Sequence, residues 1–372
     1  MTSIKGIAEA SVDASLRSPD GVCGGYRLVE HIGSGGMGEI YRARSLTDPH
    51  APDVAIKRLL AEMATDPLFI GMFLDEARLV QKLEHPNICR VHHFGQDGAH
   101  YFLVMDLVDG ASLKQLLEAS LPDGGLHPAF VASIVSDVAR ALAYAHTLVE
   151  PFAGPLNIVH RDVNPANIMV DREGTVRLVD FGLAKAKTQM HKTRPGYVKG
   201  KFGYLAPEQL RGEVDARTDV FSLGLCFYEG LTRTQLFNQP TAAATIQAIT
   251  NYAGPPSVRV TNPNIPPALD AVVRRALARN PSDRFSSAQE MHTVLERVLA
   301  ESQTRMSEAA MGSIVQSYFP DGRTSLSPAQ SAQVDEVAAS FQRKKLLRTY
   351  ALIGAAVFFL ATLATVLVMS LV

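Results

Sequence analysis

The chain has 372 residues, of which 47% are hydrophobic and 20% are charged, and its formal net charge is −1. This composition is globular, and the length suits two or three ordinary domains or one large two-lobed domain. The lack of a basic excess argues against a nucleic-acid-binding protein. Three cysteines without C-x-x-C spacing indicate reduced thiols, and eleven histidines without H-E-x-x-H spacing predict no zinc site.

The two ends of the chain differ from its middle. Residues 1–25 are small and polar without sustained periodicity, which predicts a flexible leader, and they contain no apolar stretch typical of a cleaved signal peptide. Residues 351–372, "ALIGAAVFFLATLATVLVMSLV", carry no charge. As a helix they would span roughly 33 Å, enough to cross a bilayer core of about 30 Å.

The residues before this apolar stretch predict its orientation. "RKKLLR" (343–348) is basic, and basic flanks stay on the cytoplasmic side of a membrane. We therefore expect a single-pass inner (plasma) membrane protein, with a transmembrane helix at 351–372 and a cytoplasmic remainder. Residues 301–350 are expected to form a juxtamembrane linker with one short helix. Because the span ends at the last residue, no sensor domain is expected beyond it.

Between these ends, residues 26–300 divide into a β-rich part and a helical part. Alternating patterns in "YRLVEHIG", "GEIYRARS", "DVAIKRLL" and "HYFLVMDLV" predict strands. Asp66 and Pro67 begin a helix that ends before His85 and Pro86. Helical spacing then predicts helices over 128–148, 219–231, 268–278 and 287–299. The expected fold class is α+β, with a small β-rich lobe preceding a larger helical lobe.

A glycine-rich loop lies between the first two predicted strands. "GSGGMG" (33–38) fits G-x-G-x-x-G, but a dinucleotide-binding turn opens a helix, whereas "EIYRAR" here resembles a strand. A glycine loop between antiparallel strands lets backbone N–H groups approach a triphosphate. Downstream, "VAIK" places Lys57 on a strand where it reaches the α- and β-phosphates, and Glu76 on the next helix would pair with it.

A second polar cluster, "HRDVNPANIMV" (160–170), precedes a strand. "IMV" and "VRLVD" flank the turn-rich "DREGT", which predicts a tight hairpin. In an antiparallel hairpin the start of the first strand lies beside the end of the second, so Asn167 and Asp180 should meet. Their oxygens suit Mg²⁺ beside substrate phosphates. Asp162 would then lie where a hydroxyl nucleophile arrives.

These motifs, followed by "DFG" (180–182) and "APE" (206–208), stand in the order found in protein kinases. Over about residues 26–300 the chain resembles a eukaryotic-like (Hanks-type) bacterial serine/threonine protein kinase. The resemblance implies the two-lobed protein-kinase fold, ATP and Mg²⁺ (or Mn²⁺), and protein Ser/Thr hydroxyls as acceptors. It also implies a homodimer for trans-autophosphorylation. Pro165 favours Ser/Thr over Tyr acceptors, since tyrosine kinases usually carry a nearby Arg that is absent here.

The resemblance also assigns individual residues. By this resemblance, Met105 occupies the position of the gatekeeper, and residues 106–108 (Asp106 through Val108) form the hinge that hydrogen-bonds adenine. Ala55 and Met169 would lie on the two faces of the base. Asp219 and Arg284 are similar to buried anchors of the helical lobe, the latter pairing with Glu208. The residues expected to bind ATP are Ile32, Gly33, Ser34, Gly35, Gly36, Met37, Gly38, Glu39, Ile40, Ala55, Lys57, Met105, Asp106, Val108 and Met169. Those expected to act in catalysis are Asp162, Lys57, Glu76, Asn167 and Lys201, and Asn167 and Asp180 are the expected metal ligands.

Two positions depart from the family's pattern. Asn164 stands where the family usually has Lys, and Lys201 stands where it usually has Thr before "APE". One hypothesis is that the two positions have exchanged roles, so that Lys201 supplies the cation for the transferred phosphate and Asn164 supplies the hydrogen bond. The alternative is that Lys201 is only a solvated residue of a basic loop. The departures leave a membrane-tethered pseudokinase scaffold as an alternative function. A small-molecule kinase is less favoured, because the segment between DFG and APE typically shapes a peptide groove.

Two further expectations concern the segments around the site. Arg161, beside the catalytic Asp, implies control by a phosphorylated activation segment, with Thr188 and Thr193 as candidates. The residues "VEPFAGPLN" (149–157) lengthen the approach to His160 and are expected to form a surface loop without a chemical role.

Overall fold

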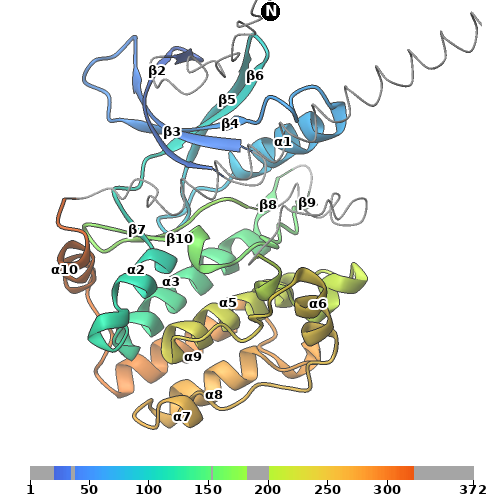
Figure 1. Cartoon of the computed structure of the whole chain (residues 1–372), viewed down its shortest axis with the longest axis vertical. Coiled ribbons are helices and arrows are strands. Elements are labelled where there is room, and N and C mark those ends of the chain that lie inside the picture. The colour runs from blue at the N-terminus through green and yellow to red at the C-terminus, as the bar shows by residue number, and fades with distance from the viewer. Residues whose placement is uncertain (1–20, 35–37, 152–153, 182–200, 322–372) are drawn as a thin grey trace, which may run out of the picture. The chain divides into compact units, whose positions relative to one another are not determined.

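The structure is a computed structural model that describes residues 21–34, 38–151, 154–181 and 201–321. These residues form a β-rich N-terminal lobe above a helical C-terminal lobe (Figure 1). The α+β, two-lobed arrangement expected from the sequence is therefore confirmed. Residues 1–20 of the leader expected at 1–25 and the apolar stretch 351–372 lie outside the described residues. Within the rest of that expected leader, Val22 and Cys23 form a strand that pairs with the next one, and Cys23 is buried, so the sheet begins before residue 26.

The N-terminal lobe is an antiparallel sheet of order β1-β2-β3-β4-β6-β5, with one helix, α1, against it. Side chains of β4 and β6 alternate between two cores: Ile56 and Val104 face one, while Leu103 and Met105 face the core shared with α1. The elements are β1 (Val22–Cys23), β2 (Tyr26–Ser34), β3 (Gly38–Ser45), β4 (Val54–Leu59), α1 (Pro67–Val80), β5 (Val91–Asp97) and β6 (His100–Asp106).

Helix α1 begins as its sequence predicts. The Asp66 side chain accepts a hydrogen bond from the backbone N–H of Leu68, and Pro67 occupies the first helical position. The helix ends at Val80, earlier than the apolar spacing predicted, and Leu83 is buried in the turn that follows. The early end matters little to the site, because Glu76 lies one turn inside the helix.

The C-terminal lobe is built around α3, whose side chains are buried along most of its length. Helices α5 and α9 pack against it. Within the part of the chain that the structure describes, α3 is the helix long and apolar enough to cross a membrane, and it is the central helix of this lobe. The helices are α2 (Leu113–Ala119), α3 (Pro128–Thr147), α5 (Ala216–Thr232), α6 (Ala242–Thr250), α7 (Val258–Thr261), α8 (Pro267–Ala276), α9 (Ala288–Glu301) and α10 (Glu308–Tyr318).

Four of these helices were predicted, and their observed bounds differ from the predicted ones by a few residues: α3, α5, α8 and α9. The short helices α2, α6 and α7 were not predicted, because each buries only a few side chains and shows little periodicity. Helix α10 is the short helix expected within 301–350, but it packs against β10 and α2.

A small sheet of order β11-β10-β7 lies where the two lobes meet (Figure 1). Its strands are β7 (Gly110–Ser112), β10 (Ile168–Asp171) and β11 (Val176–Leu178), and the short helix η3 (Pro165–Asn167) leads into β10. A separate surface hairpin, β8 (Val149–Glu150) with β9 (Gly154–Pro155), forms from the segment expected to be a loop. Both carboxylate oxygens of Glu150 accept from Lys82 Nζ, at 2.9 and 2.8 Å.

Candidate active site

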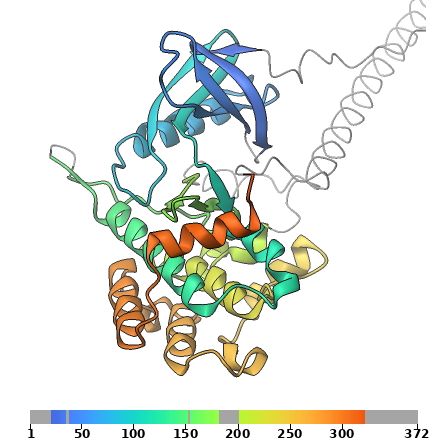
Figure 2. The same ribbon diagram turned by 90° about the vertical axis from the view of Figure 1, so that its left-hand side faces the viewer.

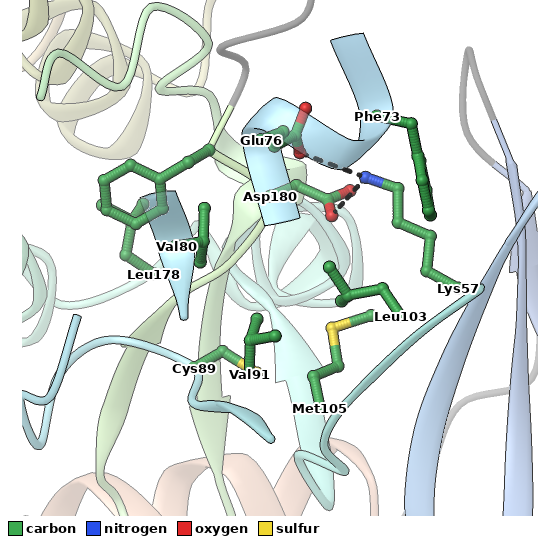
Figure 3. Close-up of a pocket in the computed structure, with 11 residues that line it drawn as sticks. Lys57, Phe73, Glu76, Val80, Cys89, Val91, Leu103, Met105, Leu178 and Asp180 are labelled. Atoms are coloured by element: carbon green, nitrogen blue, oxygen red, sulfur yellow. Dashed lines mark hydrogen bonds and ion pairs between the residues drawn. The ribbon is translucent and has the colours of Figure 1, made fainter. Parts of the chain in front are cut away.

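Lys57 projects from β4 toward the place where the two lobes meet, between two carboxylates (Figure 3). Its Nζ lies 2.8 Å from Asp180 Oδ1 and 3.7 Å from Glu76 Oε1. Burial by itself would lower the pKa of Lys57, but the carboxylates of Asp180 and Glu76 outweigh it and raise that pKa above its usual value. Lys57 is therefore held as a cation. The predicted pairing with Glu76 is present, and the closer contact with Asp180 was not predicted.

The loop 160–164 is held in place by the side chain of Asp219 of α5. This carboxylate is fully buried and accepts from the backbone N–H groups of His160 at 2.7 Å and of Arg161 at 2.8 Å. His146 Nε2 lies 2.8 Å from the same carboxylate. Burial would raise the pKa of Asp219, but the hydrogen bond and charge of His146 lower it below the usual value. The expected buried anchor is confirmed, whereas the contribution of His146 was not predictable from the sequence pattern.

This anchor holds strained backbone. Arg161 has a φ of 65° and Asp180 a φ of 55°, in the left-handed region that non-glycine residues seldom adopt. Such conformations persist only where the surrounding structure imposes them, and they concentrate at functional sites. For Arg161 the imposing contact is the hydrogen bond from its N–H to Asp219. Arg161 directly precedes Asp162, and Asp180 is itself an expected metal ligand.

Asp162 and Asn167 lie in direct contact. The amide Nδ2 of Asn167 donates to Asp162 Oδ2 at 3.0 Å and to the Asp162 carbonyl oxygen at 2.9 Å. Asn164 instead stabilises its own turn: its Nδ2 donates to the Asp162 carbonyl at 2.8 Å, and its Oδ1 accepts from the Ala166 N–H at 3.0 Å. Asn164 is thus the cap of η3, the short helix that presents Asn167.

The predicted hairpin is confirmed, with Ile168 opposite Leu178 in the β10–β11 ladder. The backbone N–H of Val179 donates to the Asn167 carbonyl at 2.9 Å, so Asn167 and Asp180 belong to neighbouring chain segments at one end of the hairpin. Because the Asn167 Nδ2 donates to Asp162, the remaining polar atom of its side chain is an oxygen. An amide oxygen beside a carboxylate is a hard donor set that fits Mg²⁺ completed by substrate phosphates.

The glycine-rich loop joins β2 and β3, as expected. Gly33 pairs with Ile40 and Ser34 with Glu39, so the strands approach the loop in register. Gly38 is required by close packing, since a Cβ there would lie 2.5 Å from the carbonyl oxygen of Arg58. The remaining loop residues expected to bind ATP fall outside the described residues: Gly35, Gly36 and Met37.

The predicted adenine-binding residues lie on strands at the junction of the lobes. Ala55 is opposite Met105 in the β4–β6 ladder, and Met169 lies on β10 of the small sheet. Asp106 ends β6, where its carboxylate lies 2.9 Å from His92 and 3.3 Å from Arg177. A pocket beside Met105 and Lys57 is lined by Phe73, Glu76, Val80, Cys89, Val91, Leu103, Leu178, Asp180 and Phe181 (Figure 3).

The segment that carries "APE" is also anchored. Arg284 forms a two-pronged ion pair with Glu208, with N–O distances of 2.6 and 2.8 Å, and both side chains are almost fully buried. This pairing was predicted from the sequence and is confirmed. Gln209 adds an unpredicted link, because its Nε2 donates to the Arg161 carbonyl at 3.2 Å. Lys201 begins the short helix η4 (Lys201–Tyr204), while its side chain and the segment with Thr188 and Thr193 lie outside the described residues.

Comparison with known proteins supports this geometry. Residues 26–295 match the family model of the protein kinase domain. The crystal structure of the Mycobacterium tuberculosis PknI kinase domain is similar with a TM-score of 0.57 and 30% identity, covering 75% of this chain and 98% of that one. The chain therefore belongs to the protein kinase family, whose members transfer the γ-phosphoryl group of ATP with the help of Mg²⁺.

Curated relatives are similar over the same region. Tyrosine-protein kinase MasK of Myxococcus xanthus is 36% identical, over 81% of this chain and 47% of its own length. Serine/threonine-protein kinase PknB of Mycolicibacterium smegmatis is 39% identical, over 76% of this chain and 44% of its own length. Serine/threonine-protein kinase PrkC of Bacillus subtilis is 33% identical, over 73% of this chain and 40% of its own length. The matched region is thus less than half of each relative.

Proposed function

We propose that this protein is a serine/threonine protein kinase that transfers the γ-phosphoryl group of Mg·ATP to hydroxyl groups of proteins. The observation that supports it best is the contact set at the junction of the lobes: Lys57 is paired with Glu76 and Asp180, and Asn167 is bonded to Asp162. These groups come from β4, α1, the loop 160–164, η3 and the segment that follows β11, and packing alone would not require five polar side chains from such separate segments to lie near one another.

Each residue has a defined task in this proposal. Lys57 holds the α- and β-phosphates through its fixed charge, and Glu76 holds Lys57. Asp162 orients the acceptor hydroxyl and takes its proton, while its hydrogen bond from Asn167 fixes its rotamer. Asn167 and Asp180 would bind Mg²⁺, which neutralises charge on the phosphates. Catalysis here consists mainly of positioning and electrostatic stabilisation.

The test is transfer of radiolabel from ATP by the purified full-length chain, with Asp162→Asn as the paired variant. The proposal expects labelling of protein acceptors by the parent and a loss of about 10²-fold or more in the variant. Equal labelling by both proteins would show a contaminating kinase or a scaffold without transfer. Retained ATP binding by Asp162→Asn serves as the control for folding.

The acceptor residue is a separate question, because one similar relative is named a tyrosine-protein kinase and two others are named serine/threonine-protein kinases. Pro165, in "DVNPAN", supports Ser/Thr acceptors. Phosphoamino-acid analysis of the labelled products decides between them. Phosphotyrosine as the main product would contradict the proposal while leaving the kinase function intact.

A pseudokinase scaffold is the second candidate, favoured by Asn164 at a position where the family usually has Lys. The structure gives Asn164 a different task, since both of its polar groups stabilise the turn before Asn167. A cation near the transferred phosphate would then come from elsewhere, and we propose Lys201 of η4. A chain without turnover would have no chemical reason to hold Lys57, Asp162 and Asp180 together.

We also propose that the kinase is anchored in the inner membrane by residues 351–372, with its catalytic lobes in the cytoplasm. The support is the uncharged stretch and the basic flank at 343–348. Protease added outside intact spheroplasts should leave residues 1–342 uncut, and cleavage there would reverse the orientation. Trans-autophosphorylation in a homodimer belongs to the same proposal, and mixing Asp162→Asn with active protein tests it by labelling of the inactive copy.

A further inference from the structure

Helix α10 lies beyond the region that matches the protein kinase family model, which ends at residue 295. It nevertheless packs against β10 and α2 as part of the helical C-terminal lobe. Figure 1 places it beside β7 and β10, and Figure 2 shows the same helix, in orange-red, lying across the helical lobe. Met311 and Val315 are fully buried in the main core. Such burial makes α10 a docked element of the lobe.

The helix contacts the turn of the β10–β11 hairpin backbone to backbone. Gly312 of α10 faces Gly174 of the turn so closely that a Cβ on Gly312 would overlap the Arg172 carbonyl oxygen. A Cβ on Gly174 would in turn overlap the Glu308 carbonyl oxygen. Two glycines facing each other permit an approach that any other pair of residues would prevent.

Side chains close the same contact from both directions. Gln316 Nε2 donates to the Arg172 carbonyl at 2.8 Å. Arg172 Nη1 donates to the carbonyl oxygens of Phe319 and Pro320, at 3.1 and 2.9 Å, and so satisfies acceptors at the C-terminal end of α10. The hairpin turn and the helix end thus bind each other reciprocally.

A second contact ties the segment before α10 to the other strand of the hairpin. Arg305 donates to Asp137 of α3 at 2.7 Å, and Asp137 also pairs with Arg140 at 3.3 Å. Arg140 donates to Asn87 Oδ1 at 2.7 Å, and Asn87 Nδ2 donates to the Val176 carbonyl of β11 at 2.8 Å. This chain of polar contacts links residue 305 to β11 through the buried side chains of Asp137 and Asn87 and the partly exposed side chain of Arg140.

The opposite end of the hairpin carries the proposed metal ligands. Asn167 directly precedes β10, and Asp180 follows β11 by two residues. The strands between are short, so the turn lies on the order of 10–13 Å from these ligands at about 3.3 Å per residue. The paired strands are stiff over this length, and a shift of the turn is therefore transmitted to the ligand end.

We propose that α10 is a positioning element for phosphoryl transfer: by holding the turn of the β10–β11 hairpin, it fixes Asn167 and Asp180 for Mg·ATP. The inference rests on the kinase function proposed above for these two residues. It makes the segment that leads toward the apolar C-terminal stretch a determinant of activity. Displacement of α10 would loosen the metal end of the site without touching nucleotide or acceptor.

The test compares two full-length variants. Gly312→Ala adds the Cβ that the Arg172 carbonyl cannot accommodate, while alanine raises the intrinsic helix propensity, so any loss reports docking and not helix formation. Ser313→Ala is the matched control, because this neighbouring side chain is exposed and bonds only within α10, to the Ala309 carbonyl. We expect Gly312→Ala to lower kcat about tenfold, since small misplacements at a reacting site are costly.

The decisive second readout is the Mg²⁺ dependence of ATP binding, measured by calorimetry without turnover. Gly312→Ala should raise the half-saturating Mg²⁺ concentration several-fold at a temperature well below its Tm, whereas Ser313→Ala should match the parent. A merely structural helix would lower Tm and leave Mg²⁺ dependence and kcat unchanged. ATP binding is measured independently of phosphoryl transfer. A parent protein that binds Mg·ATP but transfers no phosphoryl group would therefore contradict the kinase function, while the Mg²⁺ dependence of binding would still test the role of α10.

If Gly312→Ala does not fold, the double variant Arg172→Ala with Gln316→Ala replaces it, since it removes the three side-chain hydrogen bonds and adds no overlap. This variant should weaken Mg²⁺-dependent ATP binding in the same direction. The inference is overturned if the folded variant keeps both kcat and half-saturating Mg²⁺ within about twofold of the parent.

Discussion

Removal of the Asp219 carboxylate should destabilise the fold and stop catalysis together. In Asp219→Ala, the buried N–H groups of His160 and Arg161 lose their acceptor, at a cost of about 1–3 kcal/mol each. Loss of the His146 contact adds to this. We expect a decrease of about 3–6 kcal/mol in the free energy of unfolding, a large share of the 5–15 kcal/mol typical of a folded domain.

The assay is denaturant unfolding together with phosphoryl transfer, and Asp215→Ala is the control. Asp215 caps the same helix but is half exposed, so its loss should cost only about 1 kcal/mol. In Asp219→Ala the left-handed backbone of Arg161 is no longer held, and kcat should fall by about 10²-fold. The reasoning is wrong if Asp219→Ala is no more destabilised than Asp215→Ala.

The stability of the parent should also depend on pH through Asp219. Because folding lowers the pKa of this carboxyl, its contribution is fully present above the unfolded value of about 3.9 and is lost as pH falls through the lower folded pKa. The unfolding free energies of the parent and Asp219→Asn should therefore converge below about pH 4. A constant difference from pH 7 down to pH 2 would show that the charge of Asp219 is not what stabilises the loop.

Three further predictions follow from the site. Lys57→Met should lower kcat by about 10²–10³-fold with ATP binding partly kept, and transfer assays check this. Arg284→Met alone should cost about 3–5 kcal/mol in denaturant unfolding because it leaves Glu208 buried and unpaired, and adding Glu208→Leu should recover part of it. Lys201→Thr should lower kcat about 10²-fold and Asn164→Lys in that chain should restore much of it; a change within about threefold would reject the exchange.

The sequence alone determined the lobes and most of the chemistry of the site. Motif spacing and the hairpin pattern placed Lys57 with Glu76 and Asn167 beside Asp180, because strand pairing and helix order leave few ways to arrange those segments. These contacts were predictable since each joins a local pattern to a short-range geometric rule. The resemblance to protein kinases added the long-range pair of Glu208 with Arg284, which no local pattern would have given.

Only the tertiary structure showed what Asn164, His146 and α10 contact. A polar residue in a loop has the same local sequence whether it faces a phosphate or caps its own turn, and the folded loop shows that Asn164 caps η3. The contact of α10 depends on Gly174 and Gly312, which lie 138 residues apart in the chain and are ordinary glycines in the sequence. Such contacts are decided by how distant backbones pack, and sequence periodicity describes only which face of an element is apolar.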